Sequence, residues 1–230
     1  KSDDTKLKGI YEKLYAALCK QFDIPATENI WIGKLPVYAF WERKHFERFA
    51  VSVTRAPPAM ARGAGGFAGT RGAFQFVCLG PVIRNGMSKT NARTWFYELL
   101  VHETTHAFLA RYINSHHIAS WLNEGIAELL SATFVPKGGT SHKLKSAHVV
   151  VKKKGAAPFR IMFRSGNIPL DSVYYGAAQS LARYLVSRGK TKFIQLVYEF
   201  KNGTPSQEAL KKVYGMTHDQ LLLRWSKTVR

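Results

Sequence analysis

The sequence predicts an α+β protein, and three observations support this class. Strand-like apolar segments occur within the first 80 residues, a long apolar segment at 94–112 contains no Gly or Pro, and the pattern from Asp171 onward is helical. Strands that precede a central helix, with more helices after it, are typical of an α+β fold. The 230 residues, 46% of them hydrophobic, suffice for one domain at 1–230. It could have two lobes, a sheet with the central helix at 1–113 and a mostly helical part at 114–230.

The N-terminal part of the chain mixes helices and strands. We expect a helix at Thr5–Cys19, a strand at Leu35–Phe40, a helix at Arg43–Ala50 and a strand at Ala73–Leu79. The Pro- and Gly-rich stretch Pro57–Gly72 predicts an irregular connection. Within it, Gly65–Gly69 resembles a phosphate-binding loop but lacks the Lys-Ser/Thr ending, so a flexible turn before a strand is the better interpretation.

The rest of the chain is predicted from its periodicity and its capping residues. We expect helices at Thr94–Tyr112, from an N-cap at Ser120 to Thr133, and at Ser172–Arg188 between Asp171 and Gly189, with a strand at His148–Val151. Thr204–Gln207 and Thr217–Gln220 each resemble a capping box, which predicts two short terminal helices.

The segment His102-Glu103-Thr104-Thr105-His106 is the most informative motif of the chain. On a helix, two histidines four residues apart lie within about 40° of each other around the axis, so both imidazoles can bind one metal ion. Glu103 lies one step round, where its carboxylate can reach a metal-activated water without binding the metal. A catalytic zinc ion takes three protein ligands and keeps one position open, so a third ligand is required.

Several residues compete for the place of third ligand. The metzincin pattern needs Gly and His where this chain has Leu109 and Tyr112, so it is excluded. His116 and His117 are in range but lie in a polar loop, where paired histidines are usually solvated. Glu124, on the second helix, is therefore favoured.

Glu128 follows Glu124 by one helical turn. In that position its carboxylate would accept the spare ring N–H of a ligating histidine. A glutamate that simply faces solvent on the helix surface is the alternative for Glu128.

These segments resemble a known family. His102–His106 followed by Asn123–Glu128 is similar to the gluzincin zinc metallopeptidases, and the chain resembles most closely the bacterial peptidase-MA-like proteins. The likeness includes Gly33–Phe40 and Tyr175–Leu181 and spans about two thirds of the chain. It implies a zincin-like fold with a zinc-binding helix pair, one catalytic Zn²⁺ bound by His102, His106 and Glu124, and Glu103 as general base. It implies no particular substrate.

The resemblance has further implications for the site. In zinc peptidases of this kind, the strand nearest the metal helix pairs with an extended substrate, so Ala73–Leu79 is the candidate for substrate β-addition. The thermolysin-type catalytic histidine has no match in the chain. Tyr175 occupies the place where relatives have a phenol that hydrogen-bonds the tetrahedral intermediate; an ordinary packed tyrosine is the alternative. Tyr174 shares a helical stripe with Ala178 and is expected in the core.

Positive charge is concentrated in the C-terminal part. The chain contains 34 Lys and Arg but 15 Asp and Glu, a formal net charge of +19. The excess gathers just after the second metal helix and at the end of the chain, at Lys143, Lys145, Lys152, Lys153 and Lys154 and at Lys211, Lys212, Arg224, Lys227 and Arg230. Such a surface attracts anionic polymers in a salt-sensitive manner. A solvated surface that serves solubility is the simpler interpretation, because aromatic residues do not alternate with the lysines.

The cellular location follows only from indirect signals. No run of 18 apolar residues exists, so no membrane span is expected. The chain begins at Lys1 without an initiator Met, which suggests a processed or trimmed form. Cys19 and Cys78 could pair in an oxidising compartment. The resemblance suggests an exported bacterial protein, periplasmic or extracellular, while a cytoplasmic location stays open. Nothing in the sequence indicates the oligomeric state.

The sequence thus leads to a functional hypothesis and one alternative. The hypothesis is a zinc-dependent peptidase that hydrolyses a peptide or protein substrate with a metal-activated water and Glu103 as general base. The alternative is a catalytically idle, zinc-braced binding module for an anionic partner. Glu103 argues against the alternative, because a structural zinc site needs no base and usually fills its fourth position with another ligand.

Overall fold

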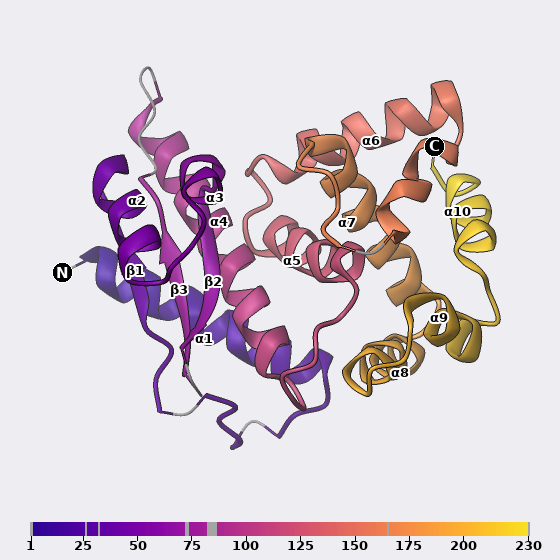
Figure 1. Ribbon diagram of the computed structural model, residues 1–230, viewed down its shortest axis with the longest axis horizontal. Coiled ribbons are helices and arrows are strands. Elements are labelled where there is room, and N and C mark those ends of the chain that lie inside the picture. Colours follow the sequence, from indigo (N-terminus) through magenta and orange to yellow (C-terminus); the bar gives the residue numbers. More distant parts are fainter. Residues whose placement is uncertain are drawn as a thin grey trace. The chain divides into compact units, whose positions relative to one another are not determined.

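The computed structural model describes residues 2–25, 27–31, 33–71, 74–81, 87–164 and 166–229, without the side chains of 2–7 and 71. The fold is α+β, with 64% of the chain helical and a small mixed sheet of three strands (Figure 1). The chain divides into two compact units, Lys1–Arg111 and Tyr112–Arg230.

The first unit contains the sheet. Its elements are α1 (Ser2–Gln21), β1 (Val37–Ala39), α2 (Arg43–Ser52), α3 (Pro58–Gly63), β2 (Gly66–Arg71), β3 (Phe74–Leu79) and α4 (Lys89–Arg111). The strand order is β1-β3-β2, so β3 is central. It runs parallel to β1 and antiparallel to β2.

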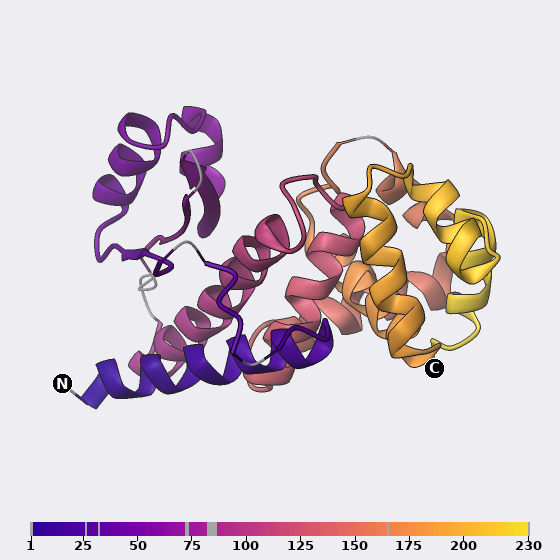
Figure 2. The ribbon, with the colours of Figure 1, turned by 90° about the horizontal axis from the view of Figure 1, so that it is seen from below.

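Alternating side chains of β3 form two separate cores. Cys78 packs with Phe46 of α2 on one face of the sheet. Val77 and Leu79 pack with Leu100 of α4 on the other face. This alternation has the period of two that a strand buried on both faces requires. Helix α4 therefore packs against the sheet, and α1 packs against α4 (Figure 2).

The prediction of an irregular connection at Pro57–Gly72 was wrong, because the segment contains α3 and β2. All six residues of β2 pair with β3, and Phe67 is buried in the core beside Phe46. Backbone pairing and this burial outweigh the low strand propensity of the glycines. The adjoining strand was predicted to begin at Ala73, which lies outside the described residues. Helix α4 begins five positions before the predicted Thr94, at Lys89.

The second unit is helical in its described part. Its elements are α5 (Ser120–Phe134), α6 (Thr140–Lys154), the 3₁₀ helix η1 (Ala157–Phe163), α7 (Ser172–Ser187), α8 (Lys190–Lys201), α9 (Ser206–Tyr214) and α10 (His218–Ser226). Helix α7 packs against both α5 and α6 (Figure 1). At Gly176 of α7 the backbone approaches α6 so closely that a Cβ atom would overlap the carbonyl of Lys143.

The strand predicted at His148–Val151 was wrong, because these residues form part of α6. Ala147 and Val151 are buried four residues apart, whereas Val149 is exposed. This is the spacing of one face of a helix, and packing against α7 outweighs the strand propensity of consecutive valines.

The predicted caps had mixed outcomes. Asp171 and Thr217 cap α7 and α10 with their side chains, as predicted, and Thr217 forms a complete capping box. Ser120 is not an N-cap, because its hydroxyl accepts a hydrogen bond from the Ile168 backbone N–H instead. Thr204 is not one either, because its hydroxyl donates to Glu199, and α9 begins after Pro205 without a side-chain cap.

A fully buried lysine fixes the loop that leads into α5. The Nζ atom of Lys201 donates to the carbonyl oxygens of Asn114 at 2.9 Å and of His116 at 2.8 Å. The Lys201 carbonyl in turn accepts from the Asn114 amide at 2.8 Å. Burial lowers the pKa of Lys201 to about 8. The end of α8 therefore anchors this loop through both its backbone and a side chain.

Lys201 should make stability depend on pH in a defined window. The folded protein releases this proton above about pH 8, whereas an unfolded chain keeps it until about pH 10.4. Between these values the folded state binds fewer protons, so the contribution of Lys201 to stability increases as the pH rises. We expect the free energy of unfolding of the wild type, relative to Lys201→Met, to rise by about 2 kcal/mol between pH 8 and pH 10 in denaturant titrations. Lys192→Met, at an exposed position of α8, should show no such trend. A difference that shrinks as the pH rises would contradict the assignment.

Candidate metal site

Helix α4 presents the two motif histidines on one side. The Nε2 atoms of His102 and His106 lie 3.0 Å apart, with the rings nearly perpendicular at 87°. Two nitrogens bound to one zinc ion in tetrahedral geometry would be separated by about 3.3 Å. The half-buried imidazoles are thus arranged to share one metal ion, as the four-residue spacing predicts.

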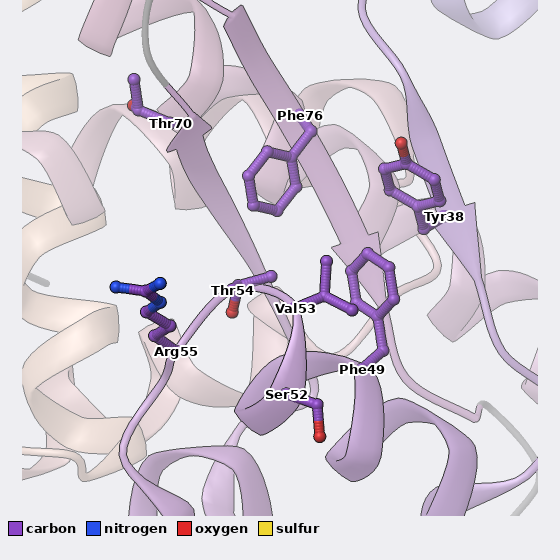
Figure 3. A pocket seen from close by; sticks show the side chains of 8 residues that line it. All are labelled: Tyr38, Phe49, Ser52, Val53, Thr54, Arg55, Thr70 and Phe76. Carbon is purple, nitrogen blue, oxygen red and sulfur yellow. The ribbon is translucent and has the colours of Figure 1, made fainter.

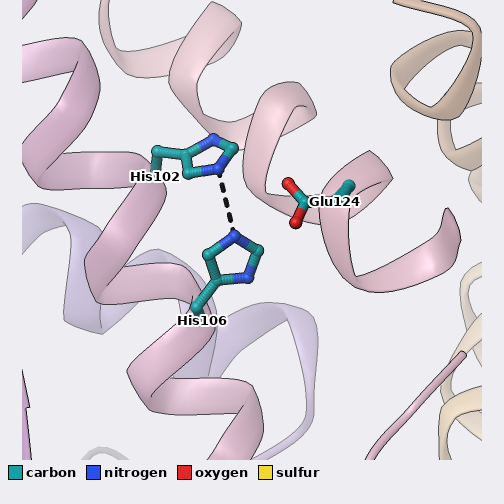
Figure 4. Close-up of side chains that lie close together, drawn as sticks. All are labelled: His102, His106 and Glu124. Carbon is teal, nitrogen blue, oxygen red and sulfur yellow. Dashed lines mark hydrogen bonds between the residues drawn. The ribbon is translucent and has the colours of Figure 1, made fainter. Parts of the chain in front are cut away.

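Glu124 of α5 completes a group of three candidate ligands. One ligand atom each from His102, His106 and Glu124 lies within 4.8 Å of the others. Figure 4 shows the carboxylate of Glu124 turned toward the two rings. Two imidazole nitrogens and one carboxylate oxygen are the donor set of an open zinc site. Among the described residues, no second group of this kind is found.

Glu103 is buried against the sheet rather than exposed beside the histidines. The side chain of Glu103 is only 6% exposed. A Cβ atom added at Gly66 would lie 3.3 Å from the Cγ of Glu103. The glycine at the start of β2 thus leaves room for this carboxylate. One turn of α4 therefore presents a histidine pair and a sheltered carboxylate.

Hydrogen bonds and packing hold this part of α4 in place. The hydroxyl of Thr104 donates to the Tyr11 hydroxyl of α1 at 3.3 Å, and burial raises the pKa of Tyr11 to about 12. Thr105 is fully buried and donates to the Val101 carbonyl at 2.8 Å. The two threonines between the histidines are therefore buried in the first unit, which fixes this turn of α4.

The cysteines do not contribute to the metal group. Cys19 and Cys78 are both free and buried. Burial, with a smaller contribution from the nearby Glu103 carboxylate, raises the pKa of Cys78 to about 12. A thiol with such a pKa stays protonated at neutral pH, so Cys78 is a core residue of the sheet.

Glu128 is fully buried, so the alternative of a solvent-facing glutamate was wrong. Its Oε1 accepts from the Nζ of Lys143 on α6 at 2.6 Å. The same Nζ lies 5.5 Å from the centre of the Tyr175 ring on α7. Glu128, Lys143 and Tyr175 therefore form a charged cluster where α5, α6 and α7 meet. The expected contact of Glu128 with a histidine stays a prediction, as does the oxyanion role of Tyr175.

Other residues singled out by the sequence lie elsewhere. His116 and His117 are exposed and outside the metal group, and His116 binds the Lys201 carbonyl through Nδ1 at 2.9 Å. Tyr174 is half-buried on α7 and packs edge-on against Phe159, with ring centres 5.9 Å apart. It thus lies at the margin of the core rather than within it.

Two charged residues near the candidate site were missed by the sequence analysis. Glu98 of α4 is only 6% exposed and precedes His102 by four residues, so it lies on the same helical stripe as the histidines. That spacing could have identified it. Lys143 was assigned only to the basic surface, and its pairing with Glu128 depends on a contact that no local pattern encodes.

A cavity of about 650 Å³ is lined by Tyr38, Phe49, Ser52, Val53, Thr54, Arg55, Thr70 and Phe76 (Figure 3). No acid or histidine lines it, so it offers no general base. Val77–Leu79 cannot add a substrate strand, because they pair with β1 on one side and β2 on the other. For Phe74–Phe76, which pair only with β2, substrate addition stays a prediction. The outer strand beside α4 is β2.

Two remaining observations concern the helices. Within the described residues, no helix combines the length and apolarity needed to cross a membrane. The last turn of α6 exposes Lys152, Lys153 and Lys154.

Comparison with known proteins found no matching family, no matching curated protein and no matching solved structure.

Proposed function

We propose that this protein is a zinc-dependent peptidase. The observation that supports the proposal is the convergence of His102, His106 and Glu124, with the sheltered carboxylate of Glu103 on the same helical turn as the histidines. Three ligands leave one position of a tetrahedral zinc ion open to water, and an adjacent carboxylate that is not a ligand is what hydrolysis requires. A structural metal site would have no use for such a carboxylate.

The donor set fits zinc chemically. Two neutral imidazoles and a carboxylate are borderline ligands that suit this ion. When bound, zinc would act as a Lewis acid that polarises a carbonyl group and lowers the pKa of a water molecule. His102 and His106 would bind through their Nε2 atoms, which already face each other at 3.0 Å.

Glu103 would transfer the proton during hydrolysis. Its carboxylate would take a proton from the attacking water, whose oxygen forms a bond to the carbonyl carbon of the substrate. The same carboxyl group would then give the proton to the departing amine as the C–N bond breaks. Burial against Gly66 restricts the rotamers of Glu103, which holds the base in one position. Tyr175 is the proposed phenol that would donate a hydrogen bond to the developing oxyanion.

The sheet favours a peptide as the substrate. Strand β2 is at the edge of the sheet, and its first residue, Gly66, lies against Glu103. An extended peptide that hydrogen-bonds to the outer edge of β2 would pass directly by the general base. A small substrate without backbone amides would gain nothing from this edge.

The proposal predicts that removing the metal abolishes hydrolysis reversibly. Protein purified with one equivalent of zinc should cleave members of a broad peptide library. Treatment with a chelator should remove both the zinc and the cleavage, and one equivalent of zinc should restore both. Metal analysis and mass spectrometry of the digests would measure the two quantities. Zinc binding without any cleavage would instead favour the zinc-braced binding module, and failure to bind zinc would contradict both functions.

A further inference from the structure

A second cavity lies in the helical unit, beside the proposed metal ligand. It has a volume of about 580 Å³, and Glu124 is among its lining residues. The remaining lining comes mainly from the start of α5, from the segment that follows η1 and from the segment between α8 and α9. If Glu124 binds the metal, as the proposed function requires, this cavity is next to the reacting bond.

The wall of the cavity is largely aromatic. It includes Trp121, Phe163 and Phe200, and the rings of Trp121 and Phe163 meet edge to face at 5.2 Å. Trp121 and Phe200 are nearly fully buried. An apolar group of a substrate would therefore find a preformed surface there.

The hydroxyl groups of the wall are already engaged within the protein. Ser206 accepts a hydrogen bond from the indole N–H of Trp121 at 3.1 Å and bonds the Nε2 of His218 at 3.0 Å. The Thr204 hydroxyl donates to Glu199 at 2.9 Å. Burial lowers the pKa of His218, which favours the neutral form of its ring. These groups shape the cavity and add no charge to it.

Arg164 provides the positive charge of the cavity. Glu124 and Arg164 are the lining residues with a formal charge at neutral pH, and metal binding would neutralise the charge of Glu124. Arg164 is exposed at the end of η1, and none of the described residues forms an ion pair or a side-chain hydrogen bond with it. By contrast, Arg160 on the same element donates to Asp219 at 2.7 Å. Asn167, also in the lining, offers a neutral amide.

We propose that this cavity is a specificity pocket for a carboxylate on the substrate, with Arg164 as the residue that recognises it. The planar guanidinium binds a carboxylate through two parallel hydrogen bonds, and the aromatic wall receives the apolar part of the same residue. The carboxylate comes either from the free C-terminus of a peptide or from an acidic side chain. The pocket therefore selects substrates with a negative charge close to the scissile bond.

Binding of small probes to the zinc-loaded protein tests the pocket without requiring hydrolysis. N-acetylphenylalanine has an aromatic ring and a free carboxylate, and its amide is the neutral counterpart. We expect the acid to bind about 10- to 100-fold more tightly than the amide in calorimetric titrations, the range of a charge-assisted hydrogen-bonded pair. N-acetylglutamate α-amide has only a side-chain carboxylate, and comparison of its affinity with that of N-acetylphenylalanine identifies which source the pocket prefers.

Arg164→Ala and Arg160→Ala form a matched pair of variants. Arg164→Ala should abolish the preference for the acid over the amide, while Arg160→Ala, which removes an equal charge from the same element, should preserve it. Equal binding of acid and amide by the wild type would overturn the proposal. A preference for the acid that survives Arg164→Ala would also overturn the proposal, because another group, such as the metal, would then bind the carboxylate.

The peptidase and the pocket can fail separately. A protein that binds the acid through Arg164 but cleaves no peptide would contradict the proposed function and leave the pocket established. A protein that cleaves peptides without any preference for the carboxylate would contradict only the pocket.

Discussion

Replacement of Glu103 by Gln is expected to reduce peptide hydrolysis by roughly 100- to 10,000-fold while the protein keeps its full zinc content. The loss is that of a general base, whose contribution lies in this range. Glutamine has the same size and preserves the packing of this side chain against Gly66, but its amide cannot take a proton from water. The kcat of the zinc-loaded variant, together with metal analysis of the same preparation, would measure both effects.

Glu124→Ala should differ from Glu103→Gln in its effect on the zinc content. It removes a proposed ligand from the group of three, so the zinc content should fall, and activity should fall with it. Glu208→Gln, at an exposed position of α9, is the control and should change neither quantity. If Glu103→Gln emptied the site and Glu124→Ala left it occupied, the roles of base and ligand would have to be exchanged.

Among Gly→Ala substitutions in the helical unit, Gly176→Ala is expected to cause the largest loss of stability. The new Cβ would overlap the carbonyl of Lys143 and lie 2.8 Å from the backbone nitrogen of Leu144. Both atoms belong to the backbone of α6, so no side-chain rotation can relieve the overlap and the helices must separate. We expect the free energy of unfolding to fall by roughly 3 kcal/mol, at the upper end of the usual cost of overpacking. Denaturant titration of the purified variant would measure this.

Gly9→Ala provides the comparison for the same chemical change. Gly9 lies within α1, and a Cβ there would meet nothing within 4 Å. Alanine should therefore raise stability by about 0.5–1 kcal/mol, because it favours the helix over the unfolded chain. Equal effects of the two substitutions would show that α6 and α7 do not approach each other as closely as described.

The motif on α4 could be predicted from the sequence because its information is local. The spacing of His102 and His106 determines their relative direction on any helix, and the 3.0 Å separation of their nitrogens agrees with it. The caps Asp171 and Thr217 were predictable for the same reason, since a cap bonds a backbone group two or three residues away.

The features that the sequence analysis missed depend on distant partners. Strand β2 exists because β3 offers it a full set of backbone hydrogen bonds, although its own residues favour a turn. Helix α6 is stabilised against α7, although its valines favour a strand. The ion pair of Glu128 with Lys143 joins two different helices. Local propensities are weak compared with such tertiary contacts.

The anchoring of the loop before α5 by Lys201 separates two events during synthesis of the chain on the ribosome. All three proposed metal ligands have been synthesised once Glu124 is added. The amine that binds the carbonyls of Asn114 and His116 is encoded 85 to 87 residues after them. A nascent chain therefore possesses its complete ligand set before it can fix the loop that leads to the third ligand. Completion of the group of three and fixing of this loop are thus distinct steps in the order of synthesis, and the second waits for α8 to be made.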